Sequence, residues 1–365
     1  MTNILDYLSW RGDLSFERNP LCEVDFLIFA QLVHAPLERL DGEGRGTSLS
    51  RLMAKVYPDP PDKAENGLIR SRYELWLAAM QSARFSSVTL ERFESHFEPE
   101  AEKQFAAALF RAGGVGVVCY RGTDATLTGW KEDFNMAFES PVPSQTEAVA
   151  FLNEAAQARG PLYACGHSKG GNLAMYAASM AEPTAREMLV GVYSFDGPGL
   201  NDRTRDGEGY RAVSPRIRAY IPESSVIGLL LGYPDAFTVI QSDSVSLWQH
   251  NPYYWHVLGP GFERAESTTR SSRFTDRALH SFLAGCPPEE RRLLVDTLFG
   301  ILSATGASKL RELPRGVATH LDEILSALKS VPPDSRRALT RSLKLLAGAG
   351  AESLGILLGE ESPGE

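Results

Sequence analysis

The sequence predicts an α/β protein with a mostly parallel central sheet and helical additions before and after it. Two observations favour this class. Short apolar runs that suit buried strands alternate with helix-like stretches between residues 104 and 241. Strand-like runs cease after about Gly261, where proline pairs separate amphipathic helical stretches. A chain of 365 residues can form one large α/β domain with additions, or two domains.

Three segments follow from this division. Residues 1–98 look mainly helical, and their Gly-, Pro- and charge-rich stretch at 41–66 is expected to be a connection or a lid. Residues 99–260 should hold the sheet, with strands expected at 104–110, 115–120, 162–165, 189–195, 217–221 and 237–241. Residues 261–365 should form a helical extension, with helices expected at 289–302, 321–328 and 337–346.

Composition and charge exclude some classes of protein. The chain is 43% hydrophobic and 23% charged, which is typical of soluble globular proteins. A net charge of -9 argues against general nucleic-acid binding, which needs a dense basic surface. The first residues lack the apolar core of a signal peptide, and the apolar run at 226–231 is too short to span a bilayer. We therefore expect a cytoplasmic protein whose contact with any membrane surface is transient.

The most informative stretch is Gly166-His-Ser-Lys-Gly170, which follows an apolar strand-like run and precedes small residues suited to a helix. A G-x-S-x-G pattern in strand–turn–helix context holds a serine in a strained turn, and the glycines let two backbones pass closely. Ser168 is therefore the candidate nucleophile. The alternative is a glycine-rich turn with a purely structural role.

A serine nucleophile needs a base and a carboxylate that orients the base. His250 lies in a loop after a predicted strand and is the favoured base, whereas His256 in an apolar run is expected to be a packed histidine. For the acid we favour Asp196, which ends the strand at 189–195. Glu223, after the next strand, and Asp235, before the last one, remain alternatives.

Two backbone N–H groups are expected to form an oxyanion hole, those of Lys169 and Thr123. The Lys169 side chain would either favour an anionic substrate or be a surface lysine paired with Glu132 or Asp133. The apolar run at 226–231 would be a lipid-facing flap, an acyl pocket or a buried helix.

No cofactor and no metal are expected, because no His, Asp and Cys residues occur with the spacing of ligands. The four cysteines lie far apart in the sequence and form no CxxC pair. Cys119 and Cys165 fall within predicted strands, so we interpret them as unreactive core thiols.

Several of these stretches carry a family resemblance. CYRGTDATLTGW followed by GHSKGGNLA resembles the class-three lipases. Together with NILDYLSWRGDLSF, QFAAALF, GWKEDFNM, FDGPG and PESSVIGLLLG, they resemble a bacterial family of lipase-like α/β-hydrolases, the Mbeg-like group. The resemblance covers nearly the whole chain. It implies an α/β-hydrolase fold, with Ser168 as nucleophile, Thr123 as oxyanion residue and His250 as base.

The resemblance further implies a serine hydrolase of the lipase or esterase type, which cleaves a lipid or other acyl ester through an acyl-enzyme. The chain departs from the class-three lipases at Pro222-Glu-Ser-Ser-Val226, where those enzymes have an aspartate. That departure favours Asp196 as the acid. It also supports the alternative function, a catalytically inactive scaffold that binds a partner.

Overall fold

The computed structural model describes residues 2–303 except 43–44, 62–66, 125, 159, 230, 232–235, 271 and 274–285. The chain forms two compact units. The first is made of Met1–Phe97, Gln104–Gly122 and Pro143–Thr268. The second is made of Glu98–Lys103, Thr123–Val142 and the described residues from Thr269 onward.

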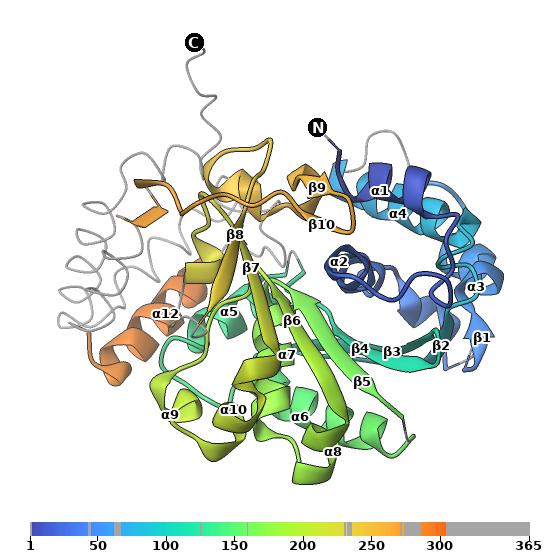
Figure 1. Cartoon of the computed structure of the whole chain (residues 1–365). Coiled ribbons are helices and arrows are strands. Elements are labelled where there is room, and N and C mark those ends of the chain that lie inside the picture. The colour runs from blue at the N-terminus through green and yellow to red at the C-terminus, as the bar shows by residue number, and fades with distance from the viewer. Residues whose placement is uncertain are drawn as a thin grey trace. The chain divides into compact units, whose positions relative to one another are not determined.

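An eight-stranded sheet is the centre of the first unit, and its strands lie side by side in chain order (Figure 1). The strands are β1 (Thr47–Ser48), β2 (Thr89–Glu98), β3 (Lys103–Ala112), β4 (Val115–Tyr120), β5 (Leu162–His167), β6 (Leu189–Phe195), β7 (Ile217–Pro222) and β8 (Phe237–Ile240). β3 and β4 are antiparallel, whereas β4 to β8 run parallel. The predicted α/β class with a mostly parallel sheet is confirmed.

Helices cover both faces of this sheet, which explains why its central strands are continuously apolar. α2 (Glu23–Leu32) packs on one face, and α7 (Lys169–Met180) packs on β5 and β6 from the other, beside α6 (Pro143–Ala156) (Figure 1). The other helices of this unit are α1 (Ile4–Arg11), α3 (Leu49–Val56), α4 (Gly67–Gln81), α8 (Pro183–Met188), α9 (Asp202–Arg205) and α10 (Glu208–Val213).

Short elements complete the unit. The 3-10 helices are η1 (Leu37–Leu40), η3 (Ser214–Arg216), η4 (Ile227–Leu229), η5 (Ser246–His250) and η6 (Pro252–Tyr254). β9 (Val257–Leu258) and β10 (Gly261–Phe262) form a small antiparallel ribbon. η4, η5 and η6 follow β7 and β8, so they are connected to the carboxyl edge of the parallel strands.

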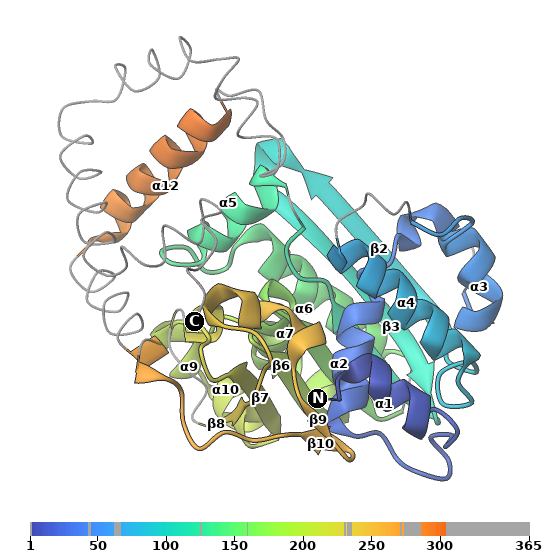
Figure 2. The ribbon, with the colours of Figure 1, turned by 90° about the horizontal axis from the view of Figure 1, so that it is seen from above.

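α2 is buried on nearly all sides because it lies between the sheet and α4 (Figure 1), and Figure 2 shows the same helices from above. Its one buried carboxylate, Asp25, is paired with the buried guanidinium of Arg84 at 2.7 and 2.5 Å. Tyr7 of α1 donates a further hydrogen bond to Asp25 at 3.0 Å. Arg84 also donates to the carbonyls of Leu14, Asn19 and Pro20, so this ion pair fastens the N-terminal loop to the core.

The first hundred residues differ from expectation in two places. The stretch expected to be a connection or lid contains α3, whose Leu49, Leu52 and Val56 are buried in the main core. These residues share one helical face, but the glycines and prolines around them hide that pattern in the sequence. Residues 89–98 form β2, a strand with several partly exposed positions, so its charged composition gave no strand signal.

The second unit contains the 3-10 helix η2 (Pro99–Ala101), α5 (Leu127–Asn135) and α12 (Pro288–Ser303), which is the helix expected at 289–302. Leu127 of α5 and Val295 and Phe299 of α12 form its buried apolar cluster. Lys131 pairs with Glu102 at 2.7 Å and with Asp296 at 2.8 Å. The helices expected at 321–328 and 337–346 lie outside the described residues.

In the described part of the chain, none of the helices combines the length and apolar character needed to cross a bilayer.

Candidate active site

Ser168 stands at the turn between β5 and α7 with φ 59° and ψ -132°. Such a backbone conformation is strained for a residue other than glycine, and it persists only where neighbouring structure holds it. Two backbone hydrogen bonds do so here: Ser168 N–H donates to the Phe195 carbonyl at 3.0 Å, and Gly171 N–H donates to the Ser168 carbonyl at 2.8 Å. The predicted turn is therefore a nucleophile-elbow geometry.

Close packing explains the glycines that flank Ser168. A Cβ atom on Gly166 would overlap the backbone of Gly170, and a Cβ atom on Gly170 would overlap the carbonyl oxygen of Tyr120 at the end of β4. Glycine is therefore required on both sides of Ser168, because α7 starts directly against the strand that precedes it.

Asp196 and His250 meet beside this elbow. Asp196 follows β6 with φ 47°, and its N–H donates to the Tyr220 carbonyl of the neighbouring β7 at 2.7 Å. His250 Nδ1 lies 2.6 Å from Asp196 Oδ2. Since a carboxylate only accepts hydrogen bonds, Nδ1–H is the donor, and Nε2 of the neutral ring is left as a proton acceptor.

His250 is held against the elbow by His167, the residue that precedes Ser168. His167 Nε2–H donates to the backbone carbonyl of His250 at 2.8 Å, and the two imidazole rings lie 4.6 Å apart. Burial, followed by the proximity of His250, lowers the pKa of His167 well below its usual range. His167 therefore stays neutral, and its Nε2–H supports the loop that carries His250.

Side-chain hydrogen bonds fix the rest of that loop. Trp255 Nε1–H donates to the Gln249 carbonyl at 2.6 Å, and the Gln249 amide donates to the Ser244 carbonyl at 2.6 Å. Gln249 Oε1 accepts the Ser224 N–H at 2.7 Å, which ties the loop to the turn after β7. The position of His250 thus depends on His167 at the end of β5, on Asp196 after β6 and on the turn after β7.

Of the other acid and base candidates, the structure describes Glu223 and His256. Glu223 is partly buried, and its N–H donates to the Ile240 carbonyl at 3.1 Å. Asp235 lies outside the described residues. His256 is buried and contacts Asp243 at 2.7 Å and Glu263 at 3.2 Å, which fits the packed histidine that the sequence predicts. Of these candidates, the structure brings Asp196 and His250 together.

Lys169 is the first residue of α7, where backbone N–H groups have no partner inside the helix. Its side chain is only 1% exposed, and Nζ donates to the backbone and side-chain oxygens of Gln104 at 2.7 and 2.9 Å. Lys169 is therefore not a surface lysine, and its pairing with Glu132 or Asp133 stays a prediction. The contacts to Gln104 hold the ammonium group, so the view that it favours an anionic substrate loses support.

The loop after β4 approaches the elbow in the first unit. A Cβ atom on Gly122 would lie 2.6 Å from the His167 carbonyl oxygen and 3.3 Å from Ser168 Cβ, so this glycine permits close passage of the backbone. Thr123, the next residue, belongs to the second unit, where its hydroxyl donates to Asp133. Its role as an oxyanion donor stays a prediction.

Sequence reasoning assigned no role to two residues that contact Asp196. The Ser225 hydroxyl donates to Asp196 Oδ1 at 2.5 Å, and Gly228 N–H donates to the same oxygen at 3.1 Å. A serine directly after the neighbouring parallel strand was the available signal. Gly228 belongs to the run at 226–231, in which Leu229 packs with Ile221 and Val239. This packing favours the buried interpretation of that run for its described residues.

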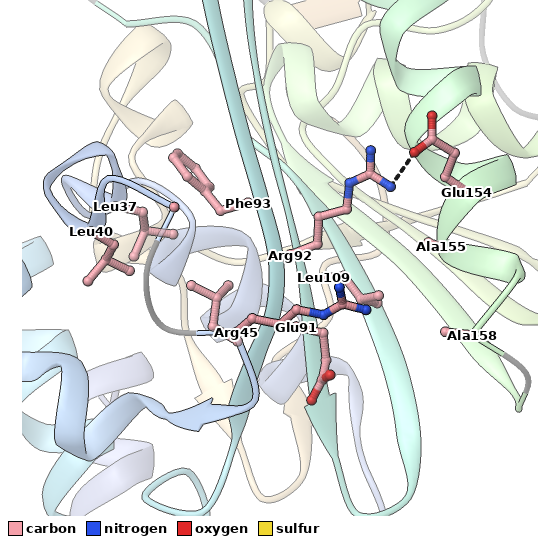
Figure 3. Close-up of a pocket in the computed structure, with 12 residues that line it drawn as sticks. Leu37, Leu40, Arg45, Glu91, Arg92, Phe93, Leu109, Glu154, Ala155 and Ala158 are labelled. Carbon is pink, nitrogen blue, oxygen red and sulfur yellow. Dashed lines mark ion pairs between the residues drawn. The ribbon is translucent and has the colours of Figure 1, made fainter.

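A cavity of about 330 Å³ lies elsewhere in the first unit, between η1, β2 and α6 (Figure 3). Leu37, Phe93 and Leu109 contribute apolar walls, and Arg92 forms an ion pair with Glu154 at its edge. None of the residues that line it belongs to the elbow or to the Asp196–His250 pair. The cavity is therefore separate from the candidate active site.

Within the described residues, no group of three or more His, Cys, Asp or Glu side chains is arranged to hold a metal ion. Cys119 and Cys165 are buried free thiols on adjacent strands, with Sγ atoms 3.4 Å apart.

None of the curated proteins is a significant match to the chain. Among solved structures, the chain is similar to a crystal structure of M37 lipase, with 13% sequence identity and a TM-score of 0.35, over 57% of this chain and 68% of that one. The Mbeg1-like family model matches residues 79–300, which include every residue of the elbow and of the Asp196–His250 pair. The chain belongs to the Mbeg1-like family.

Proposed function

We propose that this protein is a serine hydrolase of the lipase or esterase type that cleaves a carboxylic ester through an acyl-enzyme. The observation that carries the proposal is the 2.6 Å contact of His250 with Asp196, next to His167, the residue that precedes Ser168. Ser168 itself stands in a strained turn that is typical of a nucleophile. A turn with a purely structural role would not require the His250 ring to be oriented by a buried carboxylate.

In the proposed reaction, Ser168 Oγ attacks the ester carbonyl carbon while His250 Nε2 takes its proton. The Asp196 carboxylate accepts the Nδ1–H bond and stabilises the imidazolium that forms. The Lys169 N–H at the start of α7 would donate to the developing oxyanion, with Thr123 N–H as the second expected donor. His250 returns the proton to the leaving alcohol, and water then hydrolyses the acyl-enzyme by the same steps.

Exposed apolar side chains near His250 support a lipid or other acyl ester as substrate. Val245 and Trp248, within five residues of His250 in sequence, are 66% and 61% exposed. Tyr254 and Leu258, on its other side, are also exposed. Exposed apolar side chains that gather into one contiguous patch are typical of contact with an apolar ligand or surface. The proposal therefore includes a transient contact with a lipid surface.

The test is labelling by a fluorophosphonate probe, followed by hydrolysis of a panel of acyl esters of increasing chain length. Wild-type protein should be labelled and should hydrolyse esters, and Ser168→Ala should do neither while keeping the same thermal midpoint. Ser179→Ala, which removes a buried serine hydroxyl of α7 that bonds only to the Met175 carbonyl in its own helix, is the matched control and should behave as wild type. Folded wild-type protein that takes no label would instead favour the inactive scaffold.

A further inference from the structure

We infer that Ser225 is a positioning residue of this active site, which fixes the Asp196 carboxylate so that one oxygen is reserved for His250. The inference rests on the proposed function and deepens it. It assigns a role to the turn between β7 and η4. In the sheet, β7 lies next to β6, the strand that Asp196 follows.

The two oxygens of Asp196 have separate partners. Oδ1 accepts the Ser225 hydroxyl at 2.5 Å and the Gly228 N–H at 3.1 Å. Oδ2 is 2.6 Å from His250 Nδ1. Asp196 is 1% exposed and Ser225 is also buried, so these protein donors take the place of water at Oδ1.

Asp196, Ser225 and Gly228 each contact the other two. Gly228 N–H lies 3.0 Å from Ser225 Oγ as well as 3.1 Å from Asp196 Oδ1. A Cβ atom on Gly228 would lie 2.5 Å from Asp196 Oδ1 and 3.0 Å from Ser225 Oγ. The absence of a side chain at Gly228 thus allows the turn to approach the carboxylate this closely.

Orientation is the property that these contacts supply. The terminal torsion of an aspartate has a broad, roughly two-fold distribution, so an untethered carboxylate samples many directions. Hydrogen bonds from uncharged donors to a buried carboxylate are strong and directional. With Oδ1 held on the β7 side, Oδ2 is directed at Nδ1, and this keeps Nε2 as the proton acceptor that Ser168 requires.

The experiment is a double-mutant cycle of Ser225→Ala and Asp196→Asn, with a short-chain p-nitrophenyl ester as substrate. Ser225→Ala alone should lower kcat about 10- to 100-fold at nearly constant KM, since it removes one charge-assisted hydrogen bond. Ser225→Thr, which keeps a hydroxyl, should restore most of that activity. When Asp196→Asn is already present, adding Ser225→Ala should change kcat less than about two-fold, because coupled residues are not additive.

Two results would overturn the inference. One is a wild-type kcat in Ser225→Ala; the other is an equal loss of kcat from Ser225→Ala in both backgrounds, which would mean that Ser225 acts independently of Asp196. A merely structural role would appear as a lower thermal midpoint with an unchanged kcat per molecule labelled by fluorophosphonate. If the wild-type protein hydrolyses esters no faster than Ser168→Ala, the proposed function is refuted, and the inference with it.

Discussion

His250 Nδ1 lies 2.6 Å from Asp196 Oδ2, although 54 residues separate the two in the sequence. The pair joins the end of β6 to the loop after β8, with β7 between these strands in the sheet. The contact is therefore a product of strand order, and it can be tested separately at each end.

Asp196→Asn should lower kcat by about 10³- to 10⁴-fold, because an amide that donates to Nδ1 favours the wrong imidazole tautomer. Steady-state hydrolysis of a p-nitrophenyl ester measures the loss. Glu223→Gln is the matched control at the end of the next strand and should keep near wild-type kcat. A larger loss in Glu223→Gln than in Asp196→Asn would reassign the acid.

Gly228→Ala should impair both activity and stability, because its Cβ atom would lie 2.5 Å from Asp196 Oδ1 and 2.6 Å from Ile221 Cγ2. Overpacking of this kind lowers the free energy of unfolding by about 1–3 kcal/mol. Urea unfolding and kcat are measured on the same samples. Gly67→Ala provides the comparison, since no atom lies within 4 Å of its added Cβ. Equal behaviour of the two variants would show that the turn after β7 adapts freely.

Arg84→Met should destabilise the protein by about 3–5 kcal/mol, because it leaves the fully buried Asp25 carboxylate without its charged partner. The free energy of unfolding in urea measures the effect. Arg70→Met breaks the exposed pair with Glu74 and should cost less than about 1 kcal/mol. Losses of similar size would mean that the Asp25–Arg84 pair does not organise the N-terminal segment.

Acid should destabilise the fold partly through His167. Burial lowers the pKa of His167 in the folded state, whereas the unfolded histidine takes up a proton below about pH 6.5. The unfolded state then binds more protons, so the free energy of unfolding falls as pH decreases below that value, by up to about 1.4 kcal/mol per pH unit. Stability above about pH 6.5 is unaffected by this group.

The measurement is urea unfolding of wild type and His167→Gln between pH 7.5 and 5.5. The variant should lose less stability over this range than wild type, because glutamine has no proton to gain. His96→Gln is the control, since His96 is partly exposed on β2. If wild type and His167→Gln lose the same amount, His167 is protonated in the folded state.

Local backbone requirements made the elbow visible in the sequence. Gly166 and Gly170 are needed because a strand, a sharp turn and a helix follow one another within a few residues. Their spacing around Ser168 is a local requirement of the backbone, so it can be recognised in the sequence. The strands from β4 to β8 were predictable for a related reason. Helices cover both faces of the central strands, so β4, β5 and β6 consist mostly of apolar residues.

The acid could not be identified from the sequence around each candidate carboxylate. Asp196, Glu223 and Asp235 all stand next to strand ends, and only the order of β6, β7 and β8 brings Asp196 to His250. Ser225 is equally ordinary in sequence, because its role depends on the neighbouring strand. Lys169 is the converse case: a lysine is expected at the surface, but the two oxygens of Gln104 on β3 allow its ammonium group to be buried.

The sequence by itself thus determined the α/β class, the position of the elbow and a short set of acid and base candidates. These depend on apolar periodicity and on glycine at positions that no side chain can occupy. The tertiary structure decided which carboxylate meets His250, which serine holds that carboxylate and where the Lys169 charge lies. Each of these depends on contacts between side chains far apart in the chain, which only the order and register of the strands bring within hydrogen-bonding distance.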